Sequence, residues 1–314
     1  MPITSDAITA AATRIAPHVH ETPLWRLPSS ALGLPGGTPP FEAWLKLEQL
    51  QRSGSFKARG MFNRLLSHPI PAAGVIAASG GNAGIATAVA ARALGVRAEI
   101  YVPGVSSAAK RARLAALGAE VVIAGDQYAD ALLACEVRQR ETGALMTHAY
   151  DQPEVVAGAG TLAREIEMQQ GVPDSVLVSV GGGGLVAGIA AWFAGRSRVI
   201  ALEPELAPTL FNARAAGAPV DVTVGGIAAD ALGARRIGTI AWALTQQHLA
   251  HAALLSDASI VDAQRFLWAE FKLAVEPAAA LPLAALRSGV VRPCAGETVC
   301  LIVCGANLDP ATLS

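Results

Sequence analysis

The sequence has few of the features that mark secreted, membrane or nucleic-acid-binding proteins. Its 314 residues include four cysteines, none in a CxxC pair, and its formal net charge is −1. Cysteines without a disulfide-like spacing fit a reducing compartment, so we expect a cytoplasmic protein. Because no basic stripe and no membrane-length apolar run occurs, neither nucleic acid nor a membrane is an expected partner. The N-terminal segment lacks a basic leader followed by an apolar core, which argues against a signal peptide.

Two stretches of the chain alternate between short apolar runs and helical patterns. Between about residues 74 and 149, four short strands alternate with three helices, and a second alternation begins near residue 175. Such alternation is typical of parallel sheets with right-handed crossovers. We therefore predict an α/β protein with two parallel-sheet lobes and a ligand in the cleft between them. The larger lobe is expected over 1–65 and 150–314, and the smaller over 66–149.

Four consecutive glycines, Gly181 to Gly184, follow the predicted strand SVLVSV and precede a predicted helix that starts with Leu185. Glycines let the backbone approach a ligand closely, and the start of a helix adds positive dipole character. The turn therefore predicts a phosphate or carboxylate site. Close packing of strand and helix is the simpler explanation, but it does not require four glycines in a row.

A second glycine-rich turn, GGNAG, follows the predicted strand GVIAAS. Ser79 and Asn82 add polar side chains there, although an asparagine in an ordinary turn would look the same. One such turn in each alternating run predicts a ligand with two anionic ends, held between the lobes.

The first turn also matches a dinucleotide-binding pattern. Gly182, Gly184 and Ala187 give G-x-G-x-x-A after a strand, and Glu203 ends the next strand at a distance suited to a ribose. A nicotinamide-dependent oxidoreductase is therefore the alternative from another class. It leaves SGSFKARG and SGGNAG without a role. A non-catalytic two-lobe binding protein would explain both turns but not the lysine described next.

Lys57 lies in QRSGSFKARG, directly after Phe56 and among small residues. Lysine is the side chain that forms a Schiff base with a carbonyl cofactor. Pyridoxal 5′-phosphate carries an aldehyde and a phosphate, and it needs a phosphate cradle, a donor to its phenolic oxygen and a partner for its ring nitrogen. The two glycine turns offer the first two, and Cys304 is a candidate for the third.

These stretches resemble a known family over nearly the whole chain. LKLEQLQRSGSFKARG, ASGGNAG, SVGGGGLVAGIA, AVEPAAALPLAAL and LIVCGANLD are similar, in the same order, to motifs of the serine/threonine dehydratase and serine racemase family. These are pyridoxal-phosphate enzymes of fold type II, the fold of the tryptophan synthase β chain. The resemblance implies cofactor contacts at Phe56, Lys57, Asn82, Gly181, Gly182, Gly183, Gly184, Leu185, Glu276 and Cys304. It places the substrate carboxylate at Ser79, Gly80, Gly81, Asn82 and Ala83.

The resemblance also implies the reaction. An ammonia-lyase of this kind removes water and ammonia from a β-hydroxy amino acid such as L-threonine, L-serine or a bulkier phenylserine, and leaves a 2-oxo acid. Lys57 holds the cofactor aldehyde and then acts as the base at Cα. Cys304 faces the pyridine nitrogen, where a neutral thiol is a weak partner and favours prompt β-elimination. A racemase of the same family is the nearest alternative.

The sequence departs from the family pattern at several positions. Racemases have a serine where this chain has Gly80, so we expect little racemisation. Ala83 replaces a common histidine, which leaves room for a larger β-substituent. Many relatives bind a divalent cation near the segment that reads EPELAPT in this chain, residues 203–209. Here Glu203 and Ala207 remain, but Thr209 replaces the aspartate, so a metal is not expected and a weak cation site is left open. The family is usually dimeric, and a chain without a regulatory domain after its last strand suggests a catabolic enzyme.

Overall fold

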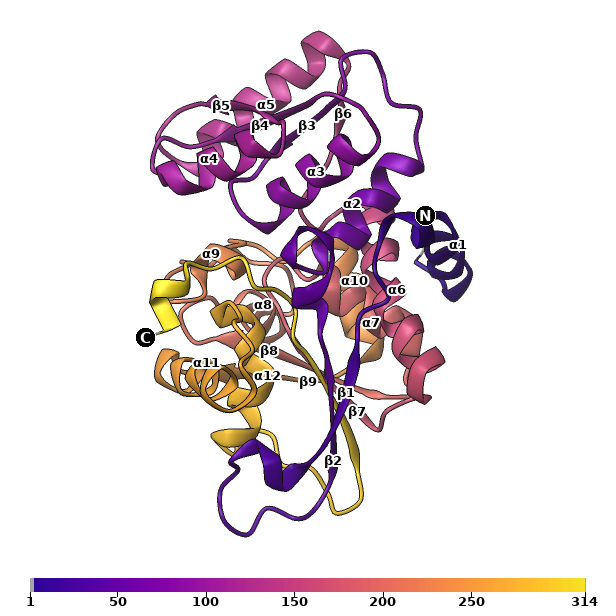
Figure 1. The fold of residues 1–314 in the computed structure, drawn as a ribbon, viewed down its shortest axis with the longest axis vertical. Helices are drawn as coiled ribbons and strands as arrows, with labels where there is room; N and C mark the ends of the chain where they lie inside the picture. The colour runs from indigo at the N-terminus through magenta and orange to yellow at the C-terminus, as the bar shows by residue number, and fades with distance from the viewer. Residues whose placement is uncertain (1–2, 314) are drawn as a thin grey trace.

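The structure is a computed structural model that describes residues 3–313, and it has two lobes, one above the other in Figure 1. The small lobe is built on a four-stranded parallel sheet with the order β5-β4-β3-β6. Its strands are β3 (Val75–Ala78), β4 (Ala98–Val102), β5 (Glu120–Ile123) and β6 (Leu145–Met146). Its helices are α3 (Asn82–Ala93), α4 (Ala108–Ala116) and α5 (Tyr128–Thr142). The predicted alternation of four strands with three helices is confirmed.

The large lobe is built on a six-stranded sheet with the order β1-β2-β10-β7-β8-β9. The first strand pairs antiparallel with the second, and the other four pairs are parallel. The strands are β1 (Leu24–Pro28), β2 (Glu42–Lys46), β7 (Ser175–Ser179), β8 (Arg198–Pro204), β9 (Leu249–Leu255) and β10 (Thr298–Ile302). The predicted α/β class with two parallel-sheet lobes is thus correct, with one antiparallel edge strand added. The domain boundaries at 66 and 149 stay a prediction.

Nine helices of the described chain accompany the large sheet. They are α1 (Ser5–Ile15), α2 (Lys57–Leu66), α6 (Pro153–Gln170), α7 (Gly184–Phe193), α8 (Thr209–Ala216), α9 (Ala229–Leu232), α10 (Thr239–His248), α11 (Asp257–Phe271) and α12 (Pro277–Arg287). Short 3₁₀ segments are η1 (Ala16–His18), η2 (Ser29–Leu32), η3 (Glu48–Leu50), η4 (Arg52–Gly54) and η5 (Pro310–Leu313). Within residues 3–313, no helix combines the length and the apolar character needed to cross a membrane.

Helix α6 packs closely against α2 and α7, and small residues make this possible. A Cβ at Gly158 would lie 2.5 Å from the carbonyl oxygen of Arg59, and a Cβ at Gly188 would lie 2.5 Å from the backbone nitrogen of Gly160. These glycines therefore serve helix packing. The close crossing fixes α2, the helix that begins with Lys57, against the large lobe.

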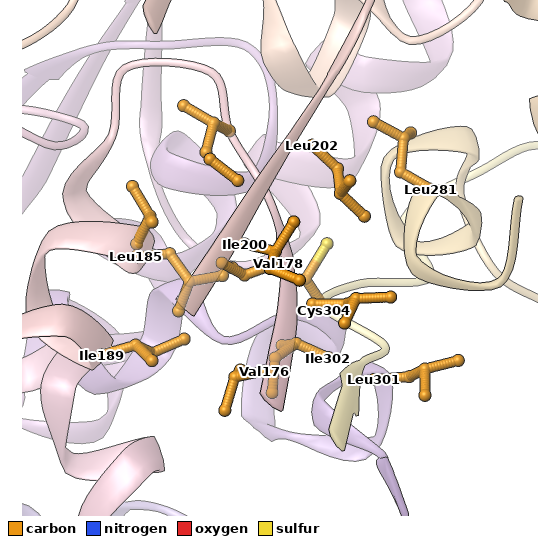
Figure 2. Packing of buried hydrophobic residues seen from close by; sticks show 14 of the residues in the cluster. Val176, Val178, Leu185, Ile189, Ile200, Leu202, Leu281, Leu301, Ile302 and Cys304 are labelled. Atoms are coloured by element: carbon orange, nitrogen blue, oxygen red, sulfur yellow. The ribbon is translucent and has the colours of Figure 1, made fainter. Parts of the chain in front are cut away.

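The core of the large lobe lies between its sheet and the flanking helices. Figure 2 shows side chains from five elements of this core together with Cys304, which follows β10. The labelled members are Val176, Val178, Leu185, Ile189, Ile200, Leu202, Leu281, Leu301 and Ile302, all buried. Because β2, β7, β8, β9 and β10 run parallel, their carboxyl ends meet at one edge, which is where ligands bind in open α/β sheets.

Candidate functional site

Lys57 is the first residue of α2, and its side chain is partly buried. Its Nζ donates to the carbonyl oxygen of Ala149 at 2.5 Å and lies 5.1 Å from the ring centroid of Phe56. Burial lowers the pKa of Lys57 to about 8, while the nearby carboxyl group of Glu276 acts in the opposite direction. No carboxylate of residues 3–313 forms an ion pair with this amine, and with this pKa roughly a tenth of it is neutral and nucleophilic at pH 7.

The glycine turn after β7 forms a backbone cradle at the start of α7. Gly183 has φ +88°, and a Cβ at Gly182 would lie 2.2 Å from the ring of Tyr150. Within the described chain, the backbone N–H groups of Gly181 to Leu185 donate to no acceptor. Unpaired N–H groups at a helix N-terminus form an anion site, and the predicted phosphate contacts therefore lie together in a suitable arrangement.

The segment between β6 and α6 connects the lysine with this cradle. Ala149 accepts the Lys57 hydrogen bond, and Tyr150 packs on Gly182 and Gly184. His148 Nδ1 accepts the backbone N–H groups of Tyr150 and Asp151 at 3.3 and 3.0 Å, which holds the segment in shape. The sequence reasoning missed these residues. Their position directly after a strand of a parallel sheet was the available signal.

Asn82 and Glu276 come from different lobes and meet at the site. The Asn82 amide donates from Nδ2 to both carboxyl oxygens of Glu276, at 2.8 and 2.9 Å. Asn82 is the first residue of α3, and Glu276 precedes α12. Burial raises the pKa of Glu276 to about 7, and the hydrogen bond from Asn82 works against that rise. A Cβ at Gly305 would lie 2.4 Å from Glu276 Oε1, so this close approach requires glycine there.

Cys304 lies two residues after the end of β10 and belongs to both the core and the site. Its carbonyl oxygen accepts the backbone N–H of Phe56 at 3.0 Å, which places it beside the lysine segment. Its side chain is 3% exposed and packs in the apolar core seen in Figure 2. Burial raises the pKa of the thiol well above its ordinary value, so the sulfur is neutral.

The expected carboxylate-binding loop, Ser79 to Ala83, connects β3 with α3. A Cβ at Gly84 would lie 1.8 Å from the carbonyl oxygen of Ser79, so glycine lets the loop close over the first turn of the helix. Gly80 faces Ser106, whose Oγ would be 3.2 Å from an added Cβ. The loop thus offers a second helix N-terminus, now in the small lobe.

Glu203 has a structural role in the described chain. Its two oxygens accept the backbone N–H groups of Leu210 and Phe211, both at 2.7 Å, at the start of α8. Its side chain is buried, and burial raises its pKa to about 7. A carboxylate occupied in this way is not free for the ribose hydroxyls that the dinucleotide-binding alternative requires. Residues 3–313 contain no group of three or more His, Cys, Asp or Glu side chains arranged to hold a metal ion.

Taken together, the site has a desolvated lysine amine, two helix N-termini from opposite lobes, and an amide beside a buried carboxyl group. In addition, Ser55 Oγ is buried near the lysine and has no hydrogen-bond partner in the part of the chain that is described. These groups fit a ligand with an aldehyde, a phenolic oxygen and a phosphate. They define a two-lobe enzyme of the pyridoxal type.

The comparisons with known proteins agree with this class. Residues 15–305 match the family model described as pyridoxal-phosphate dependent enzyme, and the chain belongs to that family. It is 36% identical to an L-threonine ammonia-lyase of Geobacter sulfurreducens, over 91% of this chain and 70% of the relative. It is also 36% identical to a phenylserine dehydratase of Ralstonia pickettii, over 86% and 84% of the two chains.

Solved structures give the same result. Maize serine racemase superposes with a TM-score of 0.91 at 30% identity and covers 100% of this chain and 96% of its own. A threonine deaminase from T.th. superposes with a TM-score of 0.88 at 34% identity, over 98% and 99% of the two chains. The chain is therefore a pyridoxal-phosphate dependent enzyme of the predicted family.

Proposed function

We propose that this protein is an ammonia-lyase that removes the elements of water from a β-hydroxy amino acid. The product of that elimination takes up water and releases ammonia, so that one hydroxy amino acid gives one 2-oxo acid and one ammonia. The single observation that carries this proposal is the partly buried amine of Lys57, whose pKa is lowered to about 8 and which donates a hydrogen bond to the carbonyl of Ala149. Such an amine can bond to an aldehyde and can also accept a proton from Cα.

The chain's own residues divide the remaining tasks. Pyridoxal 5′-phosphate, when bound, withdraws electrons from Cα and thereby lets the Cα proton leave. Lys57 takes that proton on Nζ, and the N–H groups of Gly181 to Leu185 hold the phosphate. Asn82 donates to the phenolic oxygen, with Glu276 beside it, and Phe56 packs near the ring. The turn from Ser79 to Ala83 binds the substrate carboxylate at the N-terminus of α3.

Cys304 favours elimination over other fates of the same substrate. Burial keeps its thiol neutral, so it offers the ring nitrogen a weak hydrogen bond and no negative charge. Cys304 would thus leave the ring of a bound cofactor without a charged partner, which would favour loss of the β-hydroxyl over return of the Cα proton. Two bacterial relatives are named ammonia-lyase and dehydratase, which supports elimination as the main reaction.

The small residues on the carboxylate side support a substrate range that extends beyond threonine and serine. Gly80 and Ala83 lack the bulk that a serine and a histidine would add there. A relative of similar identity is named phenylserine dehydratase, which supports a phenyl substituent at Cβ. A panel of L-serine, L-threonine and 3-phenylserine, scored for 2-oxo acid and ammonia, tests the range. Turnover confined to serine and threonine would contradict the bulky substrate.

The central experiment tests the covalent bond at Lys57. The purified protein is loaded with pyridoxal 5′-phosphate, reduced with borohydride, digested and analysed by mass spectrometry. We expect the pyridoxyl group on the peptide that contains Lys57 and on no other peptide, and we expect Lys57→Ala to lose both the label and the turnover. A nicotinamide-dependent reaction without any label would favour the oxidoreductase, and binding of an amino acid without turnover would favour a binding protein.

We also propose that the enzyme is a cytoplasmic homodimer. Trp25 on β1 and Trp268 on α11 are 38% and 41% exposed, and Trp25 contacts Phe271 of α11 edge to face, with ring centroids 5.2 Å apart. Exposed aromatic side chains on adjoining elements are common at subunit interfaces. Light scattering of the loaded enzyme measures the mass directly, and a monomer at micromolar concentration would contradict the dimer.

A further inference from the structure

A series of side-chain hydrogen bonds connects the surface of the small lobe with the candidate site. Arg113 on α4 donates from Nη2 to Oδ1 of Asn307 at 2.6 Å. Asn307 donates from Nδ2 to Oδ1 of Asn82 at 2.5 Å. Asn82 donates from Nδ2 to the two oxygens of Glu276 at 2.8 and 2.9 Å. The series runs from a cation to a carboxyl group, and every bond in it points the same way.

The direction of this series agrees with the chemistry of its first member, Arg113, and with that of the Ser53 carbonyl, which also accepts from Nδ2 of Asn307. An asparagine amide can turn by 180° and exchange its donor and acceptor, so neither Asn82 nor Asn307 fixes its own orientation. A guanidinium has donors only, and Arg113 therefore requires the oxygen of Asn307. The NH₂ group of Asn307 then donates to the oxygen of Asn82. The NH₂ group of Asn82 consequently points toward the site, where Glu276 accepts from it.

The position of Asn307 supports a role in orientation. Its Nδ2 also donates to the carbonyl oxygen of Ser53 at 2.9 Å, in the loop that leads to Lys57. A Cβ at Gly54 would lie 2.6 Å from Oδ1 of Asn307, so glycine makes room for the amide. Asn307 thus lies between the lysine segment and α3, and Arg113 reaches it from the other lobe. The guanidinium of Arg113 is exposed, so its replacement leaves no buried cavity.

We propose that Arg113 is a positioning residue that, together with the acceptor-only carbonyl of Ser53, holds the amide orientation of Asn82 through Asn307. In this orientation Asn82 presents a donor, rather than a lone pair, to the phenolic oxygen of the cofactor. The inference rests on the proposed function, because the phenolic oxygen is the acceptor that Asn82 meets there. It also makes the polarity of the site depend on contact between α4 of the small lobe and the C-terminal segment of the large lobe.

The test compares two charge reversals on the same helix. Arg113→Glu replaces donors by acceptors, so the new carboxylate repels the oxygen of Asn307 and favours the reversed series against the Ser53 carbonyl. Arg111→Glu makes the same charge change but removes only bonds to the carbonyl oxygens of Gly104 and Ser106. Arg113→Lys keeps a donor-only group. Each protein is loaded with pyridoxal 5′-phosphate, and its visible absorption spectrum and its cofactor Kd are measured.

We expect Arg113→Glu to shift the visible band to shorter wavelength, because a lone pair facing the phenolic oxygen favours its protonated form. We expect its cofactor Kd to rise about tenfold, the loss of roughly one hydrogen bond. Arg111→Glu and Arg113→Lys should stay within about twofold of the wild type. A spectrum and Kd of Arg113→Glu that match those of Arg111→Glu would overturn the inference alone. A wild-type protein that forms no coloured complex would overturn the proposed function, and the inference with it.

Discussion

Arg59, two residues after Lys57, forms a bidentate ion pair with Glu48 inside the large lobe. Nε and Nη2 of Arg59 donate to Oε2 and Oε1 of Glu48 at 2.8 and 2.7 Å, and the two side chains are 1% and 0% exposed. Glu165 accepts from Arg59 and from the buried Lys46, at 2.9 and 2.6 Å. This pairing fixes the first turn of α2, and therefore the direction in which Lys57 projects.

Breaking this pair should strongly destabilise the protein. Arg59→Met leaves the carboxylate of Glu48 buried without its partner, and the expected loss in the free energy of unfolding is about 3–5 kcal/mol. The control is Arg26→Met, which breaks the pair that Arg26 forms with Glu42 at 2.6 Å on an exposed strand. That loss should be much smaller, because the pair is exposed to solvent. Urea unfolding of the cofactor-free proteins measures both, and equal losses would contradict the role assigned to the buried pair.

The glycine cradle can be tested at its most crowded position. Gly182→Ala places a Cβ 2.2 Å from the ring of Tyr150, so the turn must shift away from the cofactor phosphate. We expect the cofactor Kd to rise at least about tenfold, or ~1.4 kcal/mol. Gly225→Ala is the matched control, because nothing lies within 4 Å of its added Cβ and its φ is not positive. An unchanged Kd for Gly182→Ala would show that the turn does not hold the phosphate.

The sequence predicted those parts of the site that local patterns determine. A strand followed by glycines and a helix places Gly181 to Gly184 at a sheet edge, and Lys57 stood out through its small neighbours. The contacts of Ala149 and Asn307 were not predictable in this way. Each depends on a backbone carbonyl or an amide that approaches the site from a distant part of the chain, and neither residue type indicates chemistry by itself.

In the fold, too, the elements that local sequence patterns determine were predicted, and those that depend on distant contacts were not. The regular alternation between residues 74 and 149 gave correct strands and helices because each element has its own apolar period. Helix α6 was not predicted, since Gly158 and Gly160 lower its helix propensity and are present for close packing against α2 and α7. Between residues 205 and 250 the sequence has no regular apolar period, yet the structure has α8, α9, α10 and the start of β9 there, which contacts within the large lobe stabilise.

Gly80 should decide whether the enzyme racemises its substrate. The wild-type protein has no side chain there that could protonate the opposite face of Cα, so chiral chromatography of L-serine incubations should show no D-serine. Gly80→Ser should fit after a shift of a few tenths of an ångström, because its Cβ would lie 3.2 Å from Oγ of Ser106. We expect this variant to form measurable D-serine while it retains elimination. Racemisation by the wild-type protein would contradict the assignment of elimination as its main reaction.

The rate at which the cofactor-free protein captures pyridoxal 5′-phosphate should depend on pH through Lys57. Only the neutral amine attacks the aldehyde, and the pKa of Lys57 is lowered to about 8. The rate should therefore rise about tenfold per pH unit below that value and level off above it. Nα-acetyl-lysine, an amine with an ordinary pKa near ~10.4, should continue to accelerate to higher pH.

The carboxyl group of Glu276 should also influence the pH dependence of the capture rate, through its effect on the pKa of Lys57. Glu276 raises the pKa of Lys57, so Glu276→Gln should lower that pKa further and move the plateau of the capture rate to lower pH. Stopped-flow absorbance at several pH values follows both proteins. Since Asn82 can still donate to the one oxygen of a glutamine, the variant keeps the local geometry. A plateau that stays at the same pH would mean that Glu276 is protonated in the free enzyme and that burial, rather than Glu276, sets the pKa of Lys57.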